Sequence, residues 1–483
     1  MPAQPSRPEY DAIVIGSGPN GLTAAALLAR RGWRVLVAEA GATPGGGTRT
    51  KELTLPGFLH DVCSAVHPTG AASPVFRELG LEQQGLRWLH PEIPLAHPLA
   101  EGRAAILHRD LDETAAGLGR DAGAYRAVFE PLVRQAANLY GDVLDPLRLP
   151  RHPLAMASFG LRAAAPASLL ARLCFRSEEA RALLAGNAAH SVLPLEAPLT
   201  SAIAVMLQFS AHAVGWPVAE GGSQAITEAL VRILNAHGGE VVCDWPVTSL
   251  AQLPPARAVL FDTTPAAMAR IAGEALPSSY QRRLQRFRHG PGVYKIDYAL
   301  SQPVPWLNAD CRRAGTVHVG GTLEEICASE RDACEGRISE KPFVLTAQPT
   351  VCDASRAPAG GHVLWAYCHV PAGCTTDMRA RIEAQIERFA PGFRDTIRQA
   401  HVMSPAAMEA YNANYPGGDI VGGMASWDQL LTRPVARLDP WSTPNPRLFL
   451  CSASTPPAGG VHGMCGAHAV RSVLRRGLMT SSR

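Results

Sequence analysis

The chain has 483 residues, of which 47% are hydrophobic and 18% charged, a balance that excludes a disordered polypeptide and suggests two domains. The formal net charge is only +3 and is spread along the chain, which argues against a nucleic-acid partner. The N-terminus has no apolar core with a cleavage site, and no run of about 18 uncharged apolar residues follows it. We therefore expect a cytoplasmic protein without a signal peptide or a transmembrane helix.

The cysteines and histidines do not form a redox or metal motif. The 11 cysteines are scattered without a Cys-x-x-Cys pair, and there is no His-Glu-x-x-His or mixed Cys/His cluster. Free thiols are therefore favoured over a redox pair, and no metal site is predicted.

The chain begins with a pattern of strand, glycine-rich turn and helix. Residues 11–15 are a short apolar run that predicts a buried parallel strand, and residues 22–31 predict an Ala-rich helix. In the turn between them, Gly16 permits a tight bend, Gly18 lets the backbone approach a diphosphate, and Gly21 lets the helix pack close to the strand. The N–H groups at the start of the helix can bind phosphate.

The residues after this helix favour a dinucleotide over another ligand. A second strand, residues 33–38, ends at Glu39, and the spacing from Gly21 is that of an acid that binds ribose hydroxyls. Ser17 lies in the same glycine-rich turn and belongs to the predicted cofactor site. The alternative interpretation is a glycine-rich turn in an unrelated α/β protein.

The next segment distinguishes FAD from NAD. Gly45 and Gly46 begin a loop that can run close along a cofactor, and Arg49 can reach a phosphate. Ordinary NAD domains enter a further crossover helix here, whereas in glutathione-reductase-type FAD domains the chain leaves the nucleotide fold early. FAD is therefore the predicted cofactor, with a flexible linker as the alternative.

The middle of the chain predicts a cap and a return to the nucleotide fold. Residues 76–214 are rich in Ala, Leu, Arg and Pro and predict a mostly helical cap. Such a cap could line a lipophilic substrate tunnel or touch a membrane, and an ordinary helical core is the alternative. A Gly-Gly pair, a helix from residue 224 and a strand at 240–243 then return the chain to the nucleotide fold, with Val247 as a candidate for backbone contact with adenine.

The last two hundred residues predict a second sheet and a second wall of the cofactor site. Apolar runs at 293–300, 343–347 and 362–370 predict strands of a mixed or antiparallel sheet, and residues 379–389 an amphipathic helix. Residues 448–451 then predict a strand, residues 452–461 a turn and residues 462–476 a helix.

Three residues of the C-terminal turn belong to the predicted flavin site. Gly460 and Val461 are expected to open the final helix and to direct N–H groups at the flavin N1–C2=O edge, and Ser452 starts the turn. A simple strand-turn-helix ending is the alternative.

The predicted fold class is therefore α/β, with a glutathione-reductase-type FAD-binding Rossmann domain interleaved with an α+β substrate domain. We expect the FAD-binding domain to comprise residues 1–75, 215–290 and 420–483. The substrate and cap domain is expected to comprise residues 76–214 and 291–419.

The sequence resembles the phytoene desaturase superfamily of FAD oxidoreductases over nearly its whole length, and most of all the phytoene dehydrogenase-related branch. The most specific strings are GFLHDVCSAVHP (57–68), NAAHS (187–191), GWPVAEGGSQAITEAL (215–230), RAPAGGHVLWAYCHVP (356–371), NYPGGDIVGG (414–423) and STPPAGGVHGMCGAHA (454–469). The chain departs from carotenoid desaturases at Gly47, where they usually have Arg, at Ser452, where they typically have Gly, and near His462, where they have Pro. These departures weaken the case for a carotene substrate but not for FAD.

The resemblance implies transfer of a hydride between a small lipophilic substrate, of polyene or isoprenoid type, and flavin N5, in a desaturase, saturase or isomerase reaction. One dinucleotide fingerprint implies that electrons pass to oxygen, a quinone or another carrier rather than to a bound NAD(P). His462 and His67 are the candidate acid–base residues, with a structural role as the alternative for both. Peripheral contact with the inner membrane face through the cap is a further expectation.

Two other functions remain open at this point. An FAD-dependent amine or amino-acid oxidase shares this cofactor fold, but the sequence shows no aromatic pair or Arg clamp that would mark one. A non-catalytic flavoprotein that binds a lipid or protein partner, as Rab GDP-dissociation inhibitors do on a similar fold, is the third option. The intact Gly16, Gly18, Gly21 and Glu39 argue against loss of the cofactor.

Overall fold

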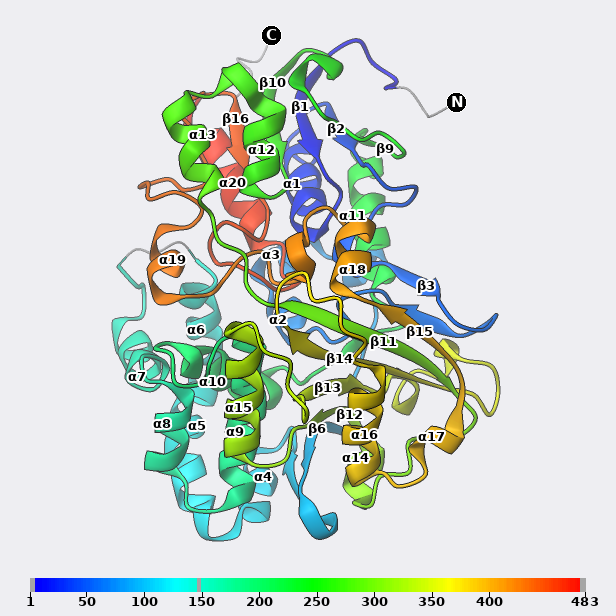
Figure 1. Cartoon of the computed structure of the whole chain (residues 1–483). Coiled ribbons are helices and arrows are strands. Elements are labelled where there is room, and N and C mark those ends of the chain that lie inside the picture. Colours follow the sequence, from blue (N-terminus) through cyan, green and yellow to red (C-terminus); the bar gives the residue numbers. More distant parts are fainter. Residues whose placement is uncertain (1–4, 146–148, 478–483) are drawn as a thin grey trace.

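A five-stranded parallel sheet forms the upper part of the molecule (Figure 1). The computed structural model describes residues 5–145 and 149–477. The strand order is β16 (Leu448–Leu450), β10 (Ala256–Phe261), β1 (Tyr10–Ile15), β2 (Val35–Ala38) and β9 (Glu240–Val242). Neighbouring strands pair in parallel throughout, and β1 in the centre is buried along its whole length, as expected for a sheet covered on both faces.

Helices cover both faces of this sheet. On one face lie α1 (Pro19–Ala29), α11 (Gln224–Ala236) and α20 (Met464–Arg475), which share one apolar core with Ala12 and Val14 of β1. On the other face lie α12 (Pro265–Ala272) and α13 (Ser278–Gln285), packed on Ile13 and Ile15. Alternate residues of one strand thus serve two separate cores.

The strands of the five-stranded sheet come from three separate stretches of the chain. Residues 10–38 supply β1 and β2, residues 240–261 supply β9 and β10, and residues 448–450 supply β16. This pattern agrees with the predicted α/β class and with an interleaved second unit. The exact domain boundaries stay a prediction.

The second sheet has seven strands and lies below the first (Figure 1). Its order is β15 (Ile397–Met403), β11 (Gly292–Leu300), β14 (His362–Val370), β13 (Val344–Ala347), β12 (Ala314–Val319), β6 (Ile93–Pro98) and β7 (Ala104–Leu107). Only β6 and β12 pair in parallel. The predicted strands 293–300, 343–347 and 362–370 are confirmed within one residue at each end.

The two faces of the seven-stranded sheet have different neighbours. Tyr294, Ile296 and Tyr298 of β11 pack with α16 (Arg379–Phe389), which closes the outer face. The residues between them in β11 point to the inner face, which is covered by α9 (Glu178–Ala188) and α15 (Leu323–Cys334).

The cap is formed mostly by helices, as predicted for residues 76–214, but the prediction missed β6 and β7 there. Its other helices are α4 (Leu111–Gly117), α5 (Ala122–Arg134), α6 (Ala136–Val143), α7 (Pro153–Ala163), α8 (Ala167–Cys174) and α10 (Thr200–Ala213). The run Ile93–Pro98 contains two prolines, at its second and last positions, and a histidine, so its strand character is weak in sequence.

The remaining elements are short. Two short antiparallel pairs join β3 (Thr50–Glu52) to β4 (Leu59–Asp61) and β5 (Trp88–Leu89) to β8 (Val218–Ala219). The other helices are α2 (Pro68–Ala72), α3 (Pro74–Leu79), α14 (Ala309–Arg313), α17 (Phe393–Thr396), α18 (Pro405–Tyr411) and α19 (Trp427–Thr432).

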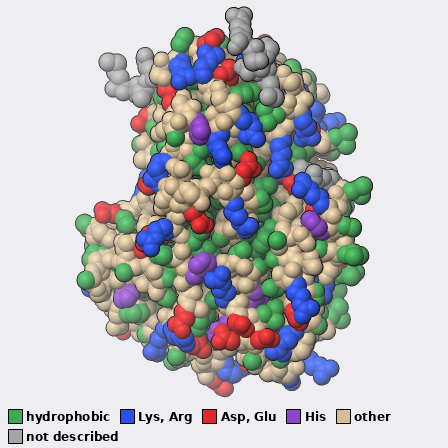
Figure 2. Space-filling model, turned by 180° about the vertical axis from the view of Figure 1, so that it is seen from behind, with side chains coloured by type: hydrophobic (Ala, Val, Ile, Leu, Met, Phe, Trp, Pro, Cys, Tyr) green, Lys and Arg blue, Asp and Glu red, His purple; other side chains and the backbone are tan. Residues whose placement is uncertain are grey.

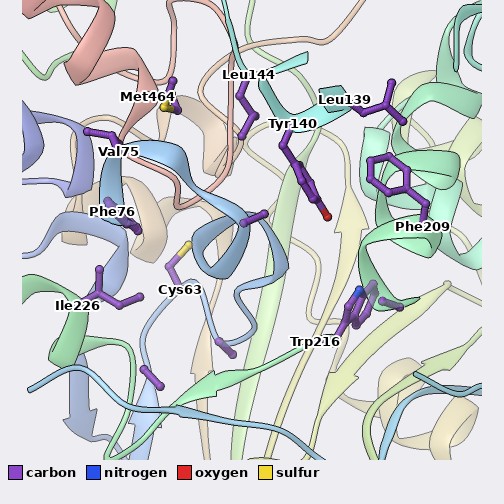
Figure 3. Packing of buried hydrophobic residues seen from close by; sticks show 14 of the residues in the cluster. Cys63, Val75, Phe76, Leu139, Tyr140, Leu144, Phe209, Trp216, Ile226 and Met464 are labelled. Atoms are coloured by element: carbon purple, nitrogen blue, oxygen red, sulfur yellow. The ribbon is translucent and has the colours of Figure 1, made fainter. Parts of the chain in front are cut away.

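One apolar core runs from the nucleotide-binding part into the cap (Figure 3). Figure 3 shows Met464 of α20 and Phe76 of α3 near Cys63, with Tyr140 and Phe209 of the cap on the other side. The Tyr140 and Phe209 rings lie 5.3 Å apart. The two units therefore share buried surface, and their relative placement is fixed by packing.

Candidate cofactor site and its surroundings

The glycine-rich turn after β1 has the geometry of a dinucleotide-binding loop. Gly16 has a positive φ of 98°, which favours glycine, and a Cβ at Gly21 would collide with the Gly16 carbonyl oxygen. Gly18 caps α1 without any side-chain hydrogen bond, so no side chain of the loop takes up the first N–H groups of the helix. The strand, turn and helix predicted from sequence are confirmed, and their roles toward FAD stay predictions.

The structure brings Glu39, Ser17, Gly45 and Arg49 together at the carboxyl end of β2. Glu39 Oε2 accepts hydrogen bonds from the Ser17 N–H, at 2.9 Å, and from the Ser17 hydroxyl. Glu39 Oε1 accepts one from Arg49 Nη2 at 3.0 Å. The Gly45 N–H donates to the Ser17 carbonyl at 3.1 Å. Glu39, the predicted ribose-binding acid, and Arg49, the predicted phosphate-binding residue, are therefore in direct contact.

The two glycine-rich loops pass each other closely. A Cβ on Gly46 would lie 3.0 Å from Gly18 Cα, and Gly45 and Gly46 have φ values of 129° and 53°. No crossover helix stands between Glu39 and β3. This is the arrangement predicted for an FAD domain, and it leaves backbone rather than side chains along the path of a dinucleotide.

Val247 lies next to the same end of the sheet. The chain enters this segment through Trp245, whose N–H donates to the Glu39 carbonyl at 2.9 Å. Val247 is buried with Leu36 and Ala38 of β2. Its predicted contact with adenine is consistent with this position and stays a prediction.

The C-terminal wall differs from its prediction in one respect. Gly460 and Val461 were expected to open the last helix, which is wrong: α20 begins at Met464, with Gly463 at its N-terminus in a left-handed conformation (φ 67°). Gly460 has a φ of 121° and lies in the preceding turn, where a Cβ on the neighbouring Gly70 would be 3.0 Å from the Val461 carbonyl. The turn therefore lies against α2, and the helix starts only after it.

Ser452 lies where β16 ends, as predicted. The preceding Cys451 continues the sheet by donating its N–H to the Phe261 carbonyl of β10 at 2.8 Å. The Ser452 carbonyl accepts the Thr455 N–H at 2.9 Å, which starts the turn.

Buried Arg433, which the sequence analysis missed, holds this turn in place. Its guanidinium donates to the backbone carbonyls of Ser454, Gly422 and Ala453 at 2.9 to 3.2 Å. Burial lowers the pKa of Arg433 to about 10. Arg433 therefore ties the NYPGGDIVGG loop to the C-terminal turn. A lone Arg before Pro gave no sequence signal for this role.

His462 has a structural role in the observed fold. Its Nδ1 accepts the Met464 N–H at 3.0 Å, which caps α20, and its carbonyl accepts the Ser73 hydroxyl at 2.7 Å. Burial lowers the pKa of His462 to about 4, so the ring is neutral at neutral pH. The catalytic role predicted for His462 remains untested, but its Nδ1 already accepts a hydrogen bond from the Met464 N–H.

His67 has one ring nitrogen without a partner. Its Nε2 lies 2.7 Å from Ser223 Oγ, and that hydroxyl donates to the Ser64 carbonyl at 2.5 Å. Ser223 Oγ therefore accepts from His67 Nε2–H, which leaves Nδ1 as a bare acceptor, buried and without a hydrogen-bond partner among the described residues. Burial lowers the pKa of His67 to about 4, which makes it a weak base.

Asp262, at the end of β10, lies inside the glycine-rich turn. Its Oδ2 accepts the Gly21 N–H at 2.9 Å, and a Cβ on Gly18 would be only 2.5 Å from the same oxygen. Burial raises the pKa of Asp262 to about 7; the Gly21 and Gly18 N–H groups oppose this rise, and the Glu39 charge adds to it. The carboxyl thus occupies space that the fingerprint glycines leave open, a contact that no sequence pattern signalled.

A buried ion pair lies on the inner face of the seven-stranded sheet. Lys295 and Asp297, two residues apart on β11, are in direct contact, and both side chains are at most 2% exposed. The Lys295 ammonium lies 5.7 Å from the centre of the Trp365 ring, which stands at 4.9 Å and nearly perpendicular to Tyr367. Burial raises the pKa of Asp297 to about 6, against the effect of Lys295.

A second buried pair links this face to the cofactor loops. Asp61 accepts from Arg356 Nη2, from Thr50 Oγ1 and from the Ser223 N–H, each at 2.8 Å. Burial acts to raise the pKa of Asp61, but the Arg356 charge and these hydrogen bonds hold it below its ordinary value. Asp61 therefore joins the loop after Arg49 to the N-terminus of α11.

The far end of the inner face carries histidines. His190, from the NAAHS string, and His318 have their Nε2 atoms 3.1 Å apart, and His369 Nδ1 lies 2.8 Å from Glu330. Burial lowers the pKa of His190 to about 3. Within residues 5–145 and 149–477, no three His, Cys, Asp or Glu side chains are arranged to hold a metal ion. The alternation of Trp365, Tyr367 and His369 in the predicted strand 362–370 was the available signal for this face.

Known proteins resemble the chain at three levels. A family model described as an NAD(P)-binding Rossmann-like domain matches residues 14–79. Pyridine nucleotide-disulfide oxidoreductase domain-containing protein 2 of Rattus norvegicus is 28% identical over 97% of this chain and 94% of its own length. All-trans-zeta-carotene desaturase of Myxococcus xanthus is 25% identical over 80% and 79%. Putrescine oxidase has a similar structure, with a TM-score of 0.61 and 18% identity over 97% of this chain and 98% of that one.

These matches agree with the fold. The chain has a Rossmann-like nucleotide-binding unit and the mixed α/β architecture of FAD-dependent amine oxidases. The sequence relatives support the wider superfamily of FAD-type oxidoreductases and leave the branch and the substrate open.

Proposed function

We propose that the protein is an FAD-dependent oxidoreductase that moves a hydride between a lipophilic substrate, of polyene or isoprenoid type, and the flavin. The observation that carries the proposal is the meeting of Glu39, Ser17, Gly45 and Arg49 beside the Gly16–Gly21 turn. These residues fit a dinucleotide because an acid and a guanidinium face a path lined by glycine backbone at the start of α1.

The residues of the chain would divide the work of binding and positioning. Glu39 would bind the ribose hydroxyls. Arg49 and the N-terminus of α1 would bind the phosphates, and the turn at Gly460 and Val461 would contact the flavin ring. When bound, the flavin supplies the hydride acceptor or donor. The inner face of the seven-stranded sheet would position the substrate and exclude water around the Lys295–Asp297 pair.

The lipophilic substrate rests on the relatives and on the cap. The printed name of the Myxococcus relative is a carotene desaturase, and the cap continues the apolar core of the cofactor domain. Desaturation would remove a hydride and a proton from neighbouring carbons, and saturation would add them. Isomerisation would involve no net oxidation or reduction of the substrate. Oxygen or a quinone would take the electrons after net oxidation.

Oxidation of an amine is the second candidate. The perpendicular Trp365 and Tyr367 rings, with the Lys295 ammonium beside Trp365, form an aromatic pair that the sequence analysis did not find. Putrescine oxidase shares the fold. Disulfide chemistry, which the name of the rat relative mentions, has less support because the sequence contains no Cys-x-x-Cys pair.

The test is anaerobic mixing of the FAD-loaded protein with lipophilic alkenes and with primary and secondary amines, followed by absorbance. Bleaching of the flavin by an alkene class supports the proposal, and bleaching by amines alone supports the second candidate. Reduced protein mixed with a polyene tests the saturase direction. Flavin that no compound of either class reduces or reoxidises would instead favour a binding protein without turnover.

A further inference from the structure

The outer surface of the cap at α7 and α8 is unusually apolar. Every exposed residue of α7 is hydrophobic, namely Pro153, Leu154, Ala157 and Leu161. Leucines beside it are exposed as well: the exposed fractions are 92% for Leu149, 87% for Leu154, 82% for Leu161, 46% for Leu169 and 74% for Leu173. We call these five leucines the leucine patch. Soluble proteins rarely expose so many large apolar side chains side by side.

The patch does not arise from a loosely packed helix. The inner side of α7 is held by buried Ala155, Phe159 and Ala163, and the Phe159 ring packs at 6.4 Å on Phe209 of α10. The helix is thus anchored on one side and apolar on the other. In Figure 1 α7 and α8 lie on the outer side of the cap, and in Figure 2 apolar side chains gather along the matching edge.

The charged residues within the segment that carries the patch have a single sign. Residues 146–177 contain five arginines and no Asp or Glu. Among them, Arg151 pairs with Asp145 at 3.4 Å and Arg172 with Glu324 at 3.3 Å. Both arginines are about half or more exposed, so these pairs are weak and can exchange for phosphate groups at a surface.

A membrane-spanning role does not follow from this composition. Among the residues that the structure describes, no single helix is long and apolar enough to cross a bilayer; α7 and α8 pass that test only as a pair bent by 94°. A bent pair with its leucines outward has the shape of a segment that lies in the interface.

We propose that the leucine patch docks onto an anionic lipid bilayer, with the leucines in the acyl boundary and the arginines at the lipid phosphates. A second copy of the chain is a poorer partner, because a twofold interface would place this segment, which carries arginines and no Asp or Glu, against itself. Neutral lipid alone would offer the arginines no net negative charge. The proposal does not depend on the proposed oxidoreductase activity.

Vesicle co-sedimentation of the full chain tests the proposal. The protein is mixed with vesicles of phosphatidylcholine alone, or of phosphatidylcholine with phosphatidylglycerol, at low and high salt. We expect binding to the mixed vesicles, weakened by salt and by omission of phosphatidylglycerol. The variant Leu154→Gln/Leu161→Gln/Leu173→Gln should lose about tenfold or more of this binding.

The matched control is Leu431→Gln/Leu438→Gln, which changes exposed leucines outside the patch and should bind as the unmodified chain does. Circular dichroism and thermal unfolding establish that both variants are folded. Equal binding by the triple variant, or no binding by the unmodified chain, would overturn the proposal. A dimer of the unmodified chain in light scattering that the triple variant does not form would also overturn the proposal, because the patch would then be a contact between copies.

Discussion

Asp262 places a titratable group directly behind the predicted diphosphate loop. Its carboxyl accepts a hydrogen bond from the Gly21 N–H, and burial raises its pKa to about 7. At pH 6 the group is mostly protonated, and at pH 8.5 it is mostly ionised and repels a diphosphate. We therefore predict that FAD binds more weakly as pH rises above about 7, by up to about tenfold per pH unit.

The variant Asp262→Asn keeps the shape and removes the charge, so its FAD dissociation constant should depend much less on pH. Quenching of FAD fluorescence by the apoprotein measures this at pH 6, 7.5 and 8.5. The folding equilibrium should change in the same sense: the unfolded carboxyl ionises near 3.9 and the folded one near 7, so apoprotein stability falls as pH rises between them. Identical pH profiles for both proteins would disprove the role of Asp262.

Lys295 compensates a buried carboxylate, so its removal should be costly. The variant Lys295→Met leaves Asp297 unpaired, and we predict a loss of about 3–5 kcal/mol in the free energy of unfolding near pH 8. Because the pKa of Asp297 is already raised to about 6, its protonation removes the unpaired charge at lower pH. The loss should therefore be smaller at pH 5, as measured by urea denaturation.

Two further variants separate this effect from lost packing. Lys295→Met/Asp297→Asn should recover much of the stability at pH 8, because neither of these two positions then carries a buried charge. Lys341→Met, at an exposed site, should change stability little. A loss for Lys295→Met that is the same at pH 5 and pH 8 would contradict the account.

At the scale of residues, sequence motifs predicted the site residues best where the role of a residue follows from its spacing to nearby residues in the chain. Glu39 and Arg49 were named from their distance to the glycine-rich turn, and the structure brings them into contact. Asp262 was missed because its partner Gly21 comes from a remote part of the chain. Lys295 was missed because its burial on the inner face depends on the pairing of the strands. His462 was named for its position in the turn, but its orientation depends on the start of α20, which spacing does not reveal.

The packing of α20 on α1 depends on the absence of one side chain. A Cβ on Gly466 would lie 2.9 Å from the Asn20 carbonyl carbon and closer still to its oxygen, so the two helices would have to separate. We predict that Gly466→Ala lowers the free energy of unfolding by about 1–3 kcal/mol and weakens FAD retention, since α1 carries the diphosphate loop. Thermal unfolding and flavin release on gel filtration measure both effects.

Gly141 in α6 is the matched control, because a Cβ there meets no atom within 4 Å. Gly141→Ala should leave stability unchanged or raise it by up to about 1 kcal/mol. Similar losses for both variants would show that the close approach of α1 and α20 is unimportant.

At the scale of elements, strands and helices with strong periodicity were predicted well. The helix at 379–389 and the strands of β11 and β14 agree with the structure. The start of α20 was placed two residues early because Gly463 adopts a left-handed conformation that sequence alone does not distinguish from a helical glycine. The strands β6 and β7 lie in a segment where Pro, Ala and His mask the alternation.

At the scale of the whole molecule, two sheets are held together by loops that cross between them. Asp61 and Arg356 join the cofactor loops to the second sheet, and Arg433 ties the NYPGGDIVGG loop to the C-terminal turn. The α/β class followed from the order of motifs along the chain. The inner face with its buried charges and histidines required the register of β11 and β14, which only the structure supplies.

The central claim is that this chain binds FAD through its N-terminal loops, and the absorption spectrum of the purified protein tests it most directly. The protein is recorded as purified and again after incubation with FAD and gel filtration. We predict a flavin spectrum with about one FAD per chain, and its loss in Glu39→Ala/Arg49→Ala folded to the same extent. A folded protein that retains no flavin before or after incubation would contradict the account.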